Sequence, residues 1–315
     1  MLDIAYTKGQ ELQRKIDILE EARRDLHVAP ISKKAYYHLA WDATLTRIEN
    51  TLRLSGTVVN KREIYKALTS GKPQTETAER ISRYKKALDY IRNDWYVTHE
   101  HISPQAVATI DSLTTKGAKL SRRVPSQALY DLKHLINYLQ SGNEHPVIQA
   151  GIVYVGIIRK DIDPSNAQNL TTLLAYMFLY KYGWDFRELL TLEKAFVETQ
   201  TDYQYALQTT KETNNAAVWL DYFVLTLTQQ VHNILAHVRT YDASSHPRGT
   251  TPHLSPRHYE IISQLDDPRA RITNKQVQKR FGISQITASR DLSTLTLMGL
   301  LASHGKGRST YYTKV

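Results

Sequence analysis

Apolar residues recur at helical spacing along most of this 315-residue chain, and only 13 glycines and 10 prolines interrupt it. Residues three and four positions apart lie on one face of a helix. This spacing predicts amphipathic helices over residues 8–26, from Ser32 toward Leu54 and over residues 76–97. Ser103 and Pro104 predict an N-cap and a first-turn proline for the next helix. The sequence therefore predicts a mainly α-helical fold.

The same spacing continues through the middle of the chain. Further helices are predicted over residues 125–139, 146–158, 170–182, 186–199, 201–210 and 215–239. With 41% hydrophobic and 23% charged residues, a chain of this length buries a sizeable core and divides into two or three domains.

The chain has no cysteine, which excludes disulfides, thiolate metal sites and cysteine catalysis. The 12 histidines are scattered and form no pair at ligand spacing with a supporting acid, so no metal site is expected. The N-terminus turns polar within a few residues, and the longest apolar patch, Leu173 to Tyr180, is far too short to span a bilayer. We expect a soluble cytoplasmic protein with no signal peptide and no membrane partner.

The formal net charge of +10 is concentrated at the C-terminal end. Residues 251–315 hold ten Lys and Arg against four acids, whereas the other 250 residues have an excess of only four positive charges. The segment 240–256 is rich in Ser, Thr, His and Pro and is predicted to be a linker. A basic excess confined to one domain favours a polyanion such as nucleic acid as its partner.

The C-terminal end carries the signals of two short helices across a glycine turn. Thr273 caps a helix that Gly282 ends, and a second helix is predicted from Gln285 to Met298. Two strands with a glycine-flanked tip follow, a pattern typical of a wing. The apolar residues of the second helix predicted to face the core are Ile286, Leu292, Leu295 and Leu297.

Over nearly its whole length, this segment resembles bacterial winged helix-turn-helix domains. The resemblance implies that the N-terminal end of the second helix and the wing contact DNA, through Ser284, Gln285, Thr287, Ser289, Arg290, Lys306 and Arg308. Gln and Arg suit adenine and guanine edges, and cations at the wing tip suit phosphates. Two alternatives remain open, namely a protein-interaction module and a local salt bridge between Arg290 and Asp291.

Several stretches between about residues 30 and 235 resemble the Fic (Fido) family, whose active members transfer AMP from ATP to protein hydroxyls. The stretch LAWDATLTRIENTLRLSGTVVNKREIYKAL resembles the family's inhibitory helix, in which Glu49 and Asn50 match but Leu45 stands at the hydroxyl position. The segment from His145 to Ala150 resembles the start of the helix that precedes the active-site loop. Later stretches follow in the family's order and spacing.

The family's His-Pro-Phe-x-Asp/Glu-Gly-Asn-Gly-Arg-x-x-Arg motif is replaced in this chain. The residues at its functional positions are Asp161, Ser165, Asn166, Ala167, Gln168, Asn169 and Thr172. The general-base histidine has become Asp161, the acidic metal ligand Ser165, and the two arginines Asn169 and Thr172. A carboxylate with a pKa of about 4 is a poor base at neutral pH, and a loop without glycines does not easily form an anion nest. No catalytic residue and no cofactor are therefore expected.

Four parts are predicted: an N-terminal helical region (1–110) with the inhibitory-like helix, a Fic-like core (111–239), the linker (240–256) and a winged helix-turn-helix domain (257–315). The predicted function is double-stranded DNA binding by a transcriptional regulator, a homodimer whose Fic-like domain serves dimerisation or sensing of a partner or effector. One alternative is a divergent AMP transferase that uses Asp161 as its base and ATP with Mg²⁺. Another is a protein-interaction scaffold.

Overall fold

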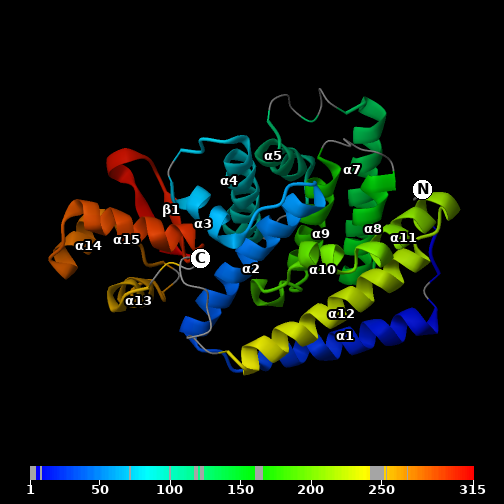
Figure 1. The fold of residues 1–315 in the computed structure, drawn as a ribbon, viewed down its shortest axis with the longest axis horizontal. Coiled ribbons are helices and arrows are strands. Elements are labelled where there is room, and N and C mark those ends of the chain that lie inside the picture. Colours follow the sequence, from blue (N-terminus) through cyan, green and yellow to red (C-terminus); the bar gives the residue numbers. More distant parts are fainter. Residues whose placement is uncertain are drawn as a thin grey trace.

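The computed structural model describes residues 5–7, 9–70, 72–98, 101–116, 120, 124–159, 166–241, 252, 254–267 and 269–315. The described part is mainly α-helical, as predicted, with one small two-stranded sheet near the C-terminus. Figure 1 shows an elongated helical body with a smaller C-terminal module at one end. Among the described helices, none combines the length and the apolar character needed to cross a membrane.

The body consists of two runs of helices. The first run comprises α1 (Gln10–Val28), α2 (Lys33–Leu54), α3 (Lys61–Thr69), α4 (Glu76–Asp89), the π-helix η1 (Tyr90–Trp95), the 3-10 helix η2 (Tyr96–Thr98) and α5 (Pro104–Thr114). The second run comprises α7 (Ser126–Ser141), α8 (Pro146–Arg159), α9 (Ala167–Lys181), η3 (Phe186–Glu188), α10 (Leu192–Glu198), α11 (Gln200–Thr213) and α12 (Ala217–Arg239).

Helix starts in the body follow their local capping residues. The Ser32 hydroxyl accepts a hydrogen bond from the backbone N–H of Ala35 at the start of α2, and Ser103 caps α5 in the same way. Asn60 and Glu63 form a reciprocal capping box at α3. These caps satisfy N–H groups that have no partner within the helix, and because they depend only on neighbouring residues, the sequence predicts them well.

Helices α8 and α9 pair at the centre of the core, where every residue from Val147 to Ile157 is buried. Gly151 lets α12 approach α8 closely, since a Cβ there would lie 2.8 Å from a methyl carbon of Leu220. The indole N–H of Trp219 donates to the Gly151 carbonyl at 2.7 Å. On the outside, α12 lies along α1, and Lys15 pairs with Asp221 at 3.1 Å (Figure 1).

Two predicted helices end or begin at other residues than expected. The helix predicted over 76–97 changes at Asp89 into the π-helix η1, which directs Arg92 to an ion pair with Glu188, 2.8 Å between Nε and Oε1. The helix predicted from residue 186 begins only at Leu192, because Phe186, Arg187 and Glu188 adopt left-handed backbone angles. Arg187 donates to the carbonyl of Ala29 at 2.7 Å, which holds this turn against the end of α1.

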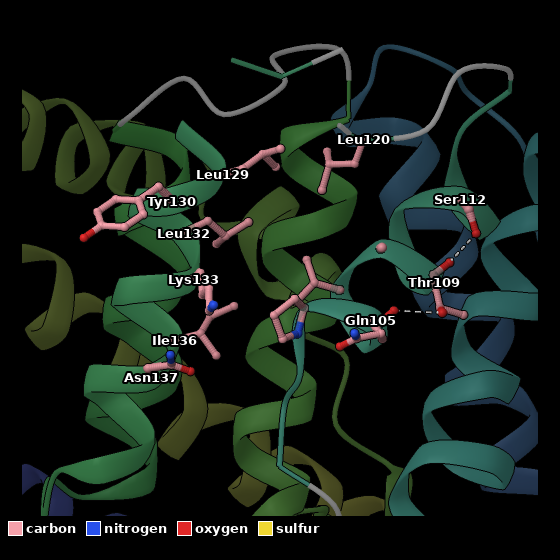
Figure 2. Close-up of a pocket in the computed structure, with 13 residues that line it drawn as sticks. Gln105, Thr109, Ser112, Leu120, Leu129, Tyr130, Leu132, Lys133, Ile136 and Asn137 are labelled. Carbon is pink, nitrogen blue, oxygen red and sulfur yellow. Dashed lines mark hydrogen bonds between the residues drawn. The ribbon is translucent and has the colours of Figure 1, made fainter. Parts of the chain in front are cut away.

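Helices α5 and α7 diverge and leave a groove of about 620 Å³ between them. Figure 2 shows the side chains of Leu129, Leu132 and Ile136 pointing into this groove from α7, with Leu120 at one end.

The C-terminal module follows with α13 (Pro256–Ser263), α14 (Asn274–Phe281), α15 (Gln285–Leu297), β1 (Leu301–His304), the short turn η5 (Gly307–Ser309) and β2 (Tyr311–Lys314). The strands pair antiparallel, with Leu301 opposite Lys314, and Ile272 bridges to Tyr312 on the other side of β2. Leu292 and Leu295 of α15 are buried as predicted. The prediction for Ile286 is wrong: its side chain is 66% exposed, because the module's core covers α15 from Ala288 onward.

The module rests on the N-terminal half of α2 and on η1. Lys33 and Lys314 both pair with Asp266, the former at 3.2 Å. The rings of Tyr37 and Tyr259 stack with their centroids 6.4 Å apart. At the end of α15, Gly299 lies against the guanidinium of Arg92. The helix that resembles an inhibitory helix therefore also carries the C-terminal module.

Gly299→Ala tests the contact between the module and η1. Gly299 has a φ of +69°, and a Cβ there would lie 2.6 Å from Nη1 of Arg92. Left-handed strain costs about 1–3 kcal/mol, and tilting Arg92 away from Glu188 adds up to about 1 kcal/mol. Gly56→Ala is the matched control, because Gly56 has a φ of +79° and open space around it. Urea titration followed by circular dichroism measures both variants, and equal losses of unfolding free energy would contradict the contact.

Candidate functional site

The N-terminal end of α15 faces away from the module core. Ser284 caps the helix, and its hydroxyl accepts a hydrogen bond from the Thr287 backbone N–H at 3.2 Å. Gln285, Ile286 and Arg290 are exposed along this end. The hydroxyl of Ser289 accepts a hydrogen bond from Asn274 of α14 at 2.8 Å, which ties the two helices together. The structure thus brings the five α15 residues predicted from the sequence onto one solvent-facing end, and adds Ile286.

Asp291 belongs to the inside of the module. Its carboxylate accepts hydrogen bonds from Arg257 at 2.6 and 3.2 Å, and Nε2 of His258 lies 3.1 Å from Oδ1. The side chain of Asp291 is only 8% exposed. The alternative in which Arg290 pairs with Asp291 is therefore wrong for the described residues, and the Arg290 guanidinium is left on the surface.

The hairpin of β1 and β2 presents Lys306 at its tip, where the residue is exposed. Gly305 has a φ of +78°, and a Cβ there would collide with the Ser309 carbonyl at 2.7 Å, so this tip turns as tightly as it does because residue 305 is glycine. The backbone of Arg308 lies in the η5 turn, while its side chain falls outside the described part of the chain. The predicted contacts of Lys306 and Arg308 with DNA stay predictions.

Helix α2 carries a buried cation that sequence reasoning did not single out as functional. Arg47 donates to the Leu190 carbonyl at 2.8 Å and to the Tyr180 hydroxyl at 3.1 Å, and its guanidinium lies 4.6 Å from the ring centre of Tyr176. Tyr176 in turn donates to the Glu193 carboxylate at 2.7 Å. Arg47 thereby joins α2 to the segment between η3 and α10.

Glu193 is the anionic end of this buried cluster and is fully buried. It also accepts a hydrogen bond from Tyr84 of α4 at 2.6 Å. Burial raises the pKa of the Glu193 carboxyl, while the charge of Arg47 and the hydrogen bond from Tyr84 oppose that rise. A carboxylate and a guanidinium bridged by tyrosines in this way form a structural anchor between α2, α4, α9 and α10.

Glu49 and Asn50, the residues that match the inhibitory helix, lie one turn further along α2. The Asn50 amide is buried and donates to the Thr46 carbonyl on its own helix at 2.8 Å. Glu49 is half-buried and makes no ion pair with any residue that the structure describes. On this part of α2 it is Arg47 that reaches the segment between η3 and α10.

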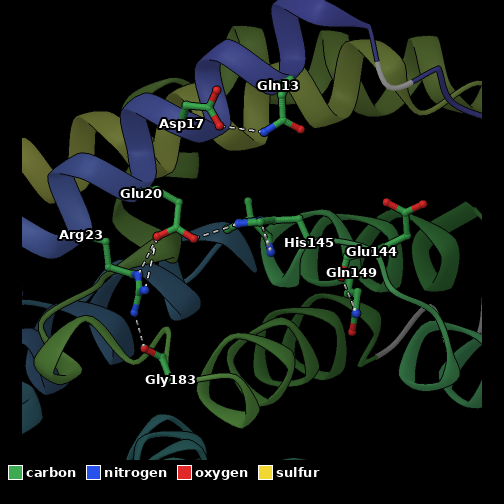
Figure 3. A network of polar contacts seen from close by, with 9 residues as sticks. Gln13, Asp17, Glu20, Arg23, Glu144, His145, Gln149 and Gly183 are labelled. Atoms are coloured by element: carbon green, nitrogen blue, oxygen red, sulfur yellow. Dashed lines mark hydrogen bonds and ion pairs between the residues drawn. The ribbon is translucent and has the colours of Figure 1, made fainter.

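The start of α8 is fastened to α1 by a polar network. Nε2 of His145 lies 3.3 Å from the Glu20 carboxylate, and Arg23 pairs with the same carboxylate at 3.3 Å (Figure 3). Arg23 also donates to the Gly183 carbonyl at 3.0 Å, and its guanidinium lies 4.5 Å from the ring centre of Trp184. His145 is thus a structural histidine that positions α8.

Asn166, directly before α9, is 3% exposed and ties α9 to α5. Its side-chain amide donates to the Asp111 carboxylate at 3.2 Å and to the Thr114 hydroxyl at 2.9 Å. Its own oxygen accepts a hydrogen bond from Asn169 at 2.9 Å. The two preceding candidate positions, Asp161 and Ser165, lie outside the described residues.

Gln168 and Thr172 of α9 take part in a second buried network. The Gln168 amide donates to the Tyr154 hydroxyl at 2.6 Å and accepts from the Tyr203 hydroxyl at 3.0 Å, and the two hydroxyls are 2.8 Å apart. Thr172 donates back to the Gln168 carbonyl at 2.8 Å. Burial raises the pKa of Tyr154 to about 12 despite these hydrogen bonds, so the phenol is neutral at physiological pH.

Comparison with solved structures finds a crystal structure of a Fic family protein from Desulfovibrio desulfuricans G20. The alignment has a TM-score of 0.62 at 11% sequence identity and covers 98% of this chain and 97% of that one. This chain has a Fic-like fold. No family model matches the sequence, and no curated protein matches it.

A Fic-like fold does not by itself carry the chemistry of the family. At the described positions predicted to correspond to the family motif, the side-chain amides of Asn166, Gln168 and Asn169 are hydrogen-bonded to protein groups, and Thr172 is bonded to its own helix. These four residues carry no positive charge. They do not fit a triphosphate, which needs cations and free N–H donors.

Proposed function

We propose that the protein binds double-stranded DNA through its C-terminal module, which acts as a winged helix-turn-helix domain, and that it regulates transcription. The observation that carries the proposal is the exposed end of α15, where Gln285 and Arg290 stand beside Ile286 while Leu292 and Leu295 hold the helix in the module. An α-helix of this kind fits the major groove, where Gln reads adenine and Arg reads guanine. Lys306 on the hairpin supplies a cation for the phosphate backbone.

The motif positions of the Fic-like body support a role other than AMP transfer. Asn166 and Gln168 bond α9 to α5, α8 and α11, which stabilises the body. We propose that the body dimerises or senses a signal, and that a two-fold dimer places two modules on half-sites about one helical turn apart. Under this proposal, Asp161 and Ser165 have no catalytic task.

Selection from a random duplex library tests the proposal directly. The full-length chain is immobilised, bound duplexes are amplified over several rounds, and the enriched sequences are read. We expect an enriched motif with two inverted half-sites whose centres lie about 10 base pairs apart. A library that stays random after selection would overturn the proposal. Enrichment of a single half-site would refute the two-fold dimer.

Ile286 gives a second prediction for the selected site. An exposed aliphatic side chain on a helix in the major groove contacts the C5 methyl group of thymine. Replacing the contacted thymine by uracil, which lacks only this methyl group, is expected to weaken binding by about three- to tenfold, in keeping with the loss of a buried methyl. Fluorescence anisotropy on a series of singly substituted duplexes finds the position. The variant Ile286→Ser is expected to bind the thymine and uracil duplexes equally, and a remaining preference would refute the contact.

A further inference from the structure

The groove between α5 and α7 has an apolar interior. Val107 of α5, Leu132 and Ile136 of α7, and Leu120 line it and are themselves almost fully buried. The hydroxyls of Thr109 and Ser112 on the α5 wall donate to carbonyls of their own helix, at 2.9 and 2.8 Å (Figure 2). The α5 wall therefore offers mainly carbon surface to an occupant.

Among the residues that the structure describes, this apolar groove has a single charged lining residue. Of the described residues that line it, Lys133 alone is charged, and it is exposed on α7 next to the turn that carries Leu132. Within the described part of the chain, Lys133 makes no ion pair. A lysine pairs its ammonium with an anion while its methylene stem covers apolar surface. The charge pattern is thus complementary to a molecule with one apolar end and one anionic end.

The size of the groove favours a small molecule. Its volume of about 620 Å³ lies within the range of about 300–1,000 Å³ that is typical of small-ligand sites. Its α5 wall consists of a helix of only 11 residues, and Leu120 covers one end, so the groove is short. A long partner helix would extend past the end of α5 and past Leu120.

We propose that the α5–α7 groove binds a small amphipathic carboxylate. The apolar chain lies against Val107, Leu132 and Ile136, and the carboxylate pairs with the ammonium group of Lys133. Binding is reversible, and no bond is made or broken. The positions predicted to match the family motif contact α5 through Asp111 and Thr114, and neither of these residues lines the groove.

The groove is lined by α5, a helix whose contacts lead to the C-terminal module. Asn166 fastens α5 to the start of α9, and α5 also packs on α4, which continues into the π-helix η1. Arg92 of η1 lies against Gly299 of the C-terminal module. An occupant that moves α5 relative to α7 therefore acts on the elements that support the module. This part of the inference rests on the proposed function, whereas carboxylate binding itself does not.

Calorimetric titration of the full-length protein with octanoate and with 1-octanol tests the site. The two probes share an apolar chain, and only octanoate carries the carboxylate. We expect saturable binding at one site per chain, with octanoate preferred by roughly fivefold, the effect of one exposed ion pair. Absence of saturable heat with octanoate, or equal affinity for the two probes, would overturn the proposal.

Three variants localise the site. Lys133→Met is expected to abolish the preference for octanoate while 1-octanol still binds, and Ala108→Trp, at an exposed position of the α5 wall, is expected to block both probes. Lys211→Met, an exposed lysine on α11, is the matched control and is expected to bind like the unchanged protein. Circular dichroism confirms that each variant is folded. Octanoate binding that survives Ala108→Trp in a folded protein would place the site elsewhere and refute the groove.

Measuring the affinity for DNA in the presence of octanoate distinguishes the two proposals. Octanoate is expected to change the affinity for the selected duplex at least twofold in the unchanged protein and not in Ala108→Trp. Octanoate binding without any DNA binding would support the groove and refute the proposed function. DNA binding without octanoate binding would refute the groove and leave the proposed function supported.

Discussion

Arg47→Met is expected to lower the free energy of unfolding by about 3–5 kcal/mol, the cost of removing one partner of a buried charge cluster. The guanidinium makes hydrogen bonds to the Leu190 carbonyl and the Tyr180 hydroxyl, and its charge opposes the rise that burial causes in the pKa of the Glu193 carboxyl. Methionine fills similar space but satisfies none of these groups. Urea denaturation followed by circular dichroism and tyrosine fluorescence measures the loss.

Two further variants make this result specific. Arg53→Met removes an exposed arginine from the same helix and is expected to change stability by less than about 0.5 kcal/mol. The double variant Arg47→Met with Glu193→Gln neutralises both ends and is expected to be more stable than the sum of the single changes predicts. If Arg47→Met costs no more than Arg53→Met, the buried cluster does not anchor α2.

Arg290→Ala is expected to weaken binding to the selected duplex by about 1–3 kcal/mol, roughly fivefold to 150-fold, and to relax the base preference at one position. The reason is that Arg290 is exposed on α15, since Arg257 and His258 occupy the Asp291 carboxylate. Fluorescence anisotropy with the selected duplex and with duplexes altered at single positions measures both effects.

Lys306→Ala and Arg308→Ala are expected to act differently from Arg290→Ala. Under the proposed function a cation at the hairpin contacts phosphate, so each change is expected to weaken binding to all sequences alike and to lower the salt slope by about one. A series of KCl concentrations measures this slope. Lys211→Met, far from the module in sequence and on α11, serves as the control. Unchanged affinity in all three module variants would refute DNA binding by this face.

Much of the fold follows from short-range signals. The caps at Ser32, Ser103 and Thr273, and the glycine after α14, depend on residues within a turn of one another, so they are predictable from sequence. The helix-turn-helix pattern and the hairpin are local in the same sense. The break at Asp89 was not predictable, because the π-helix that follows holds Arg92 against Glu188, a residue 96 positions further along the chain.

The candidate site, too, was only partly predictable from the sequence. The exposed end of α15 was expected from its position after the turn, except that Ile286 was assigned to the core from helical spacing alone. Spacing identifies which residues share a face, but only the packing of α13 and α14 shows where along α15 the covered surface begins. The position of this aliphatic residue, so close to the N-cap of its helix, was the one signal that favoured exposure.

By itself, the sequence determined the helical character and the concentration of positive charge in the last 65 residues. These are properties of composition, period and residue identity. Only the tertiary structure decided which polar groups meet: Arg47 with the Glu193 cluster, Asn166 with Asp111, and Gln168 with Tyr154 and Tyr203. Such partners lie far apart in the chain, and burial requires each to find a matching donor or acceptor, a condition that only the packed core imposes.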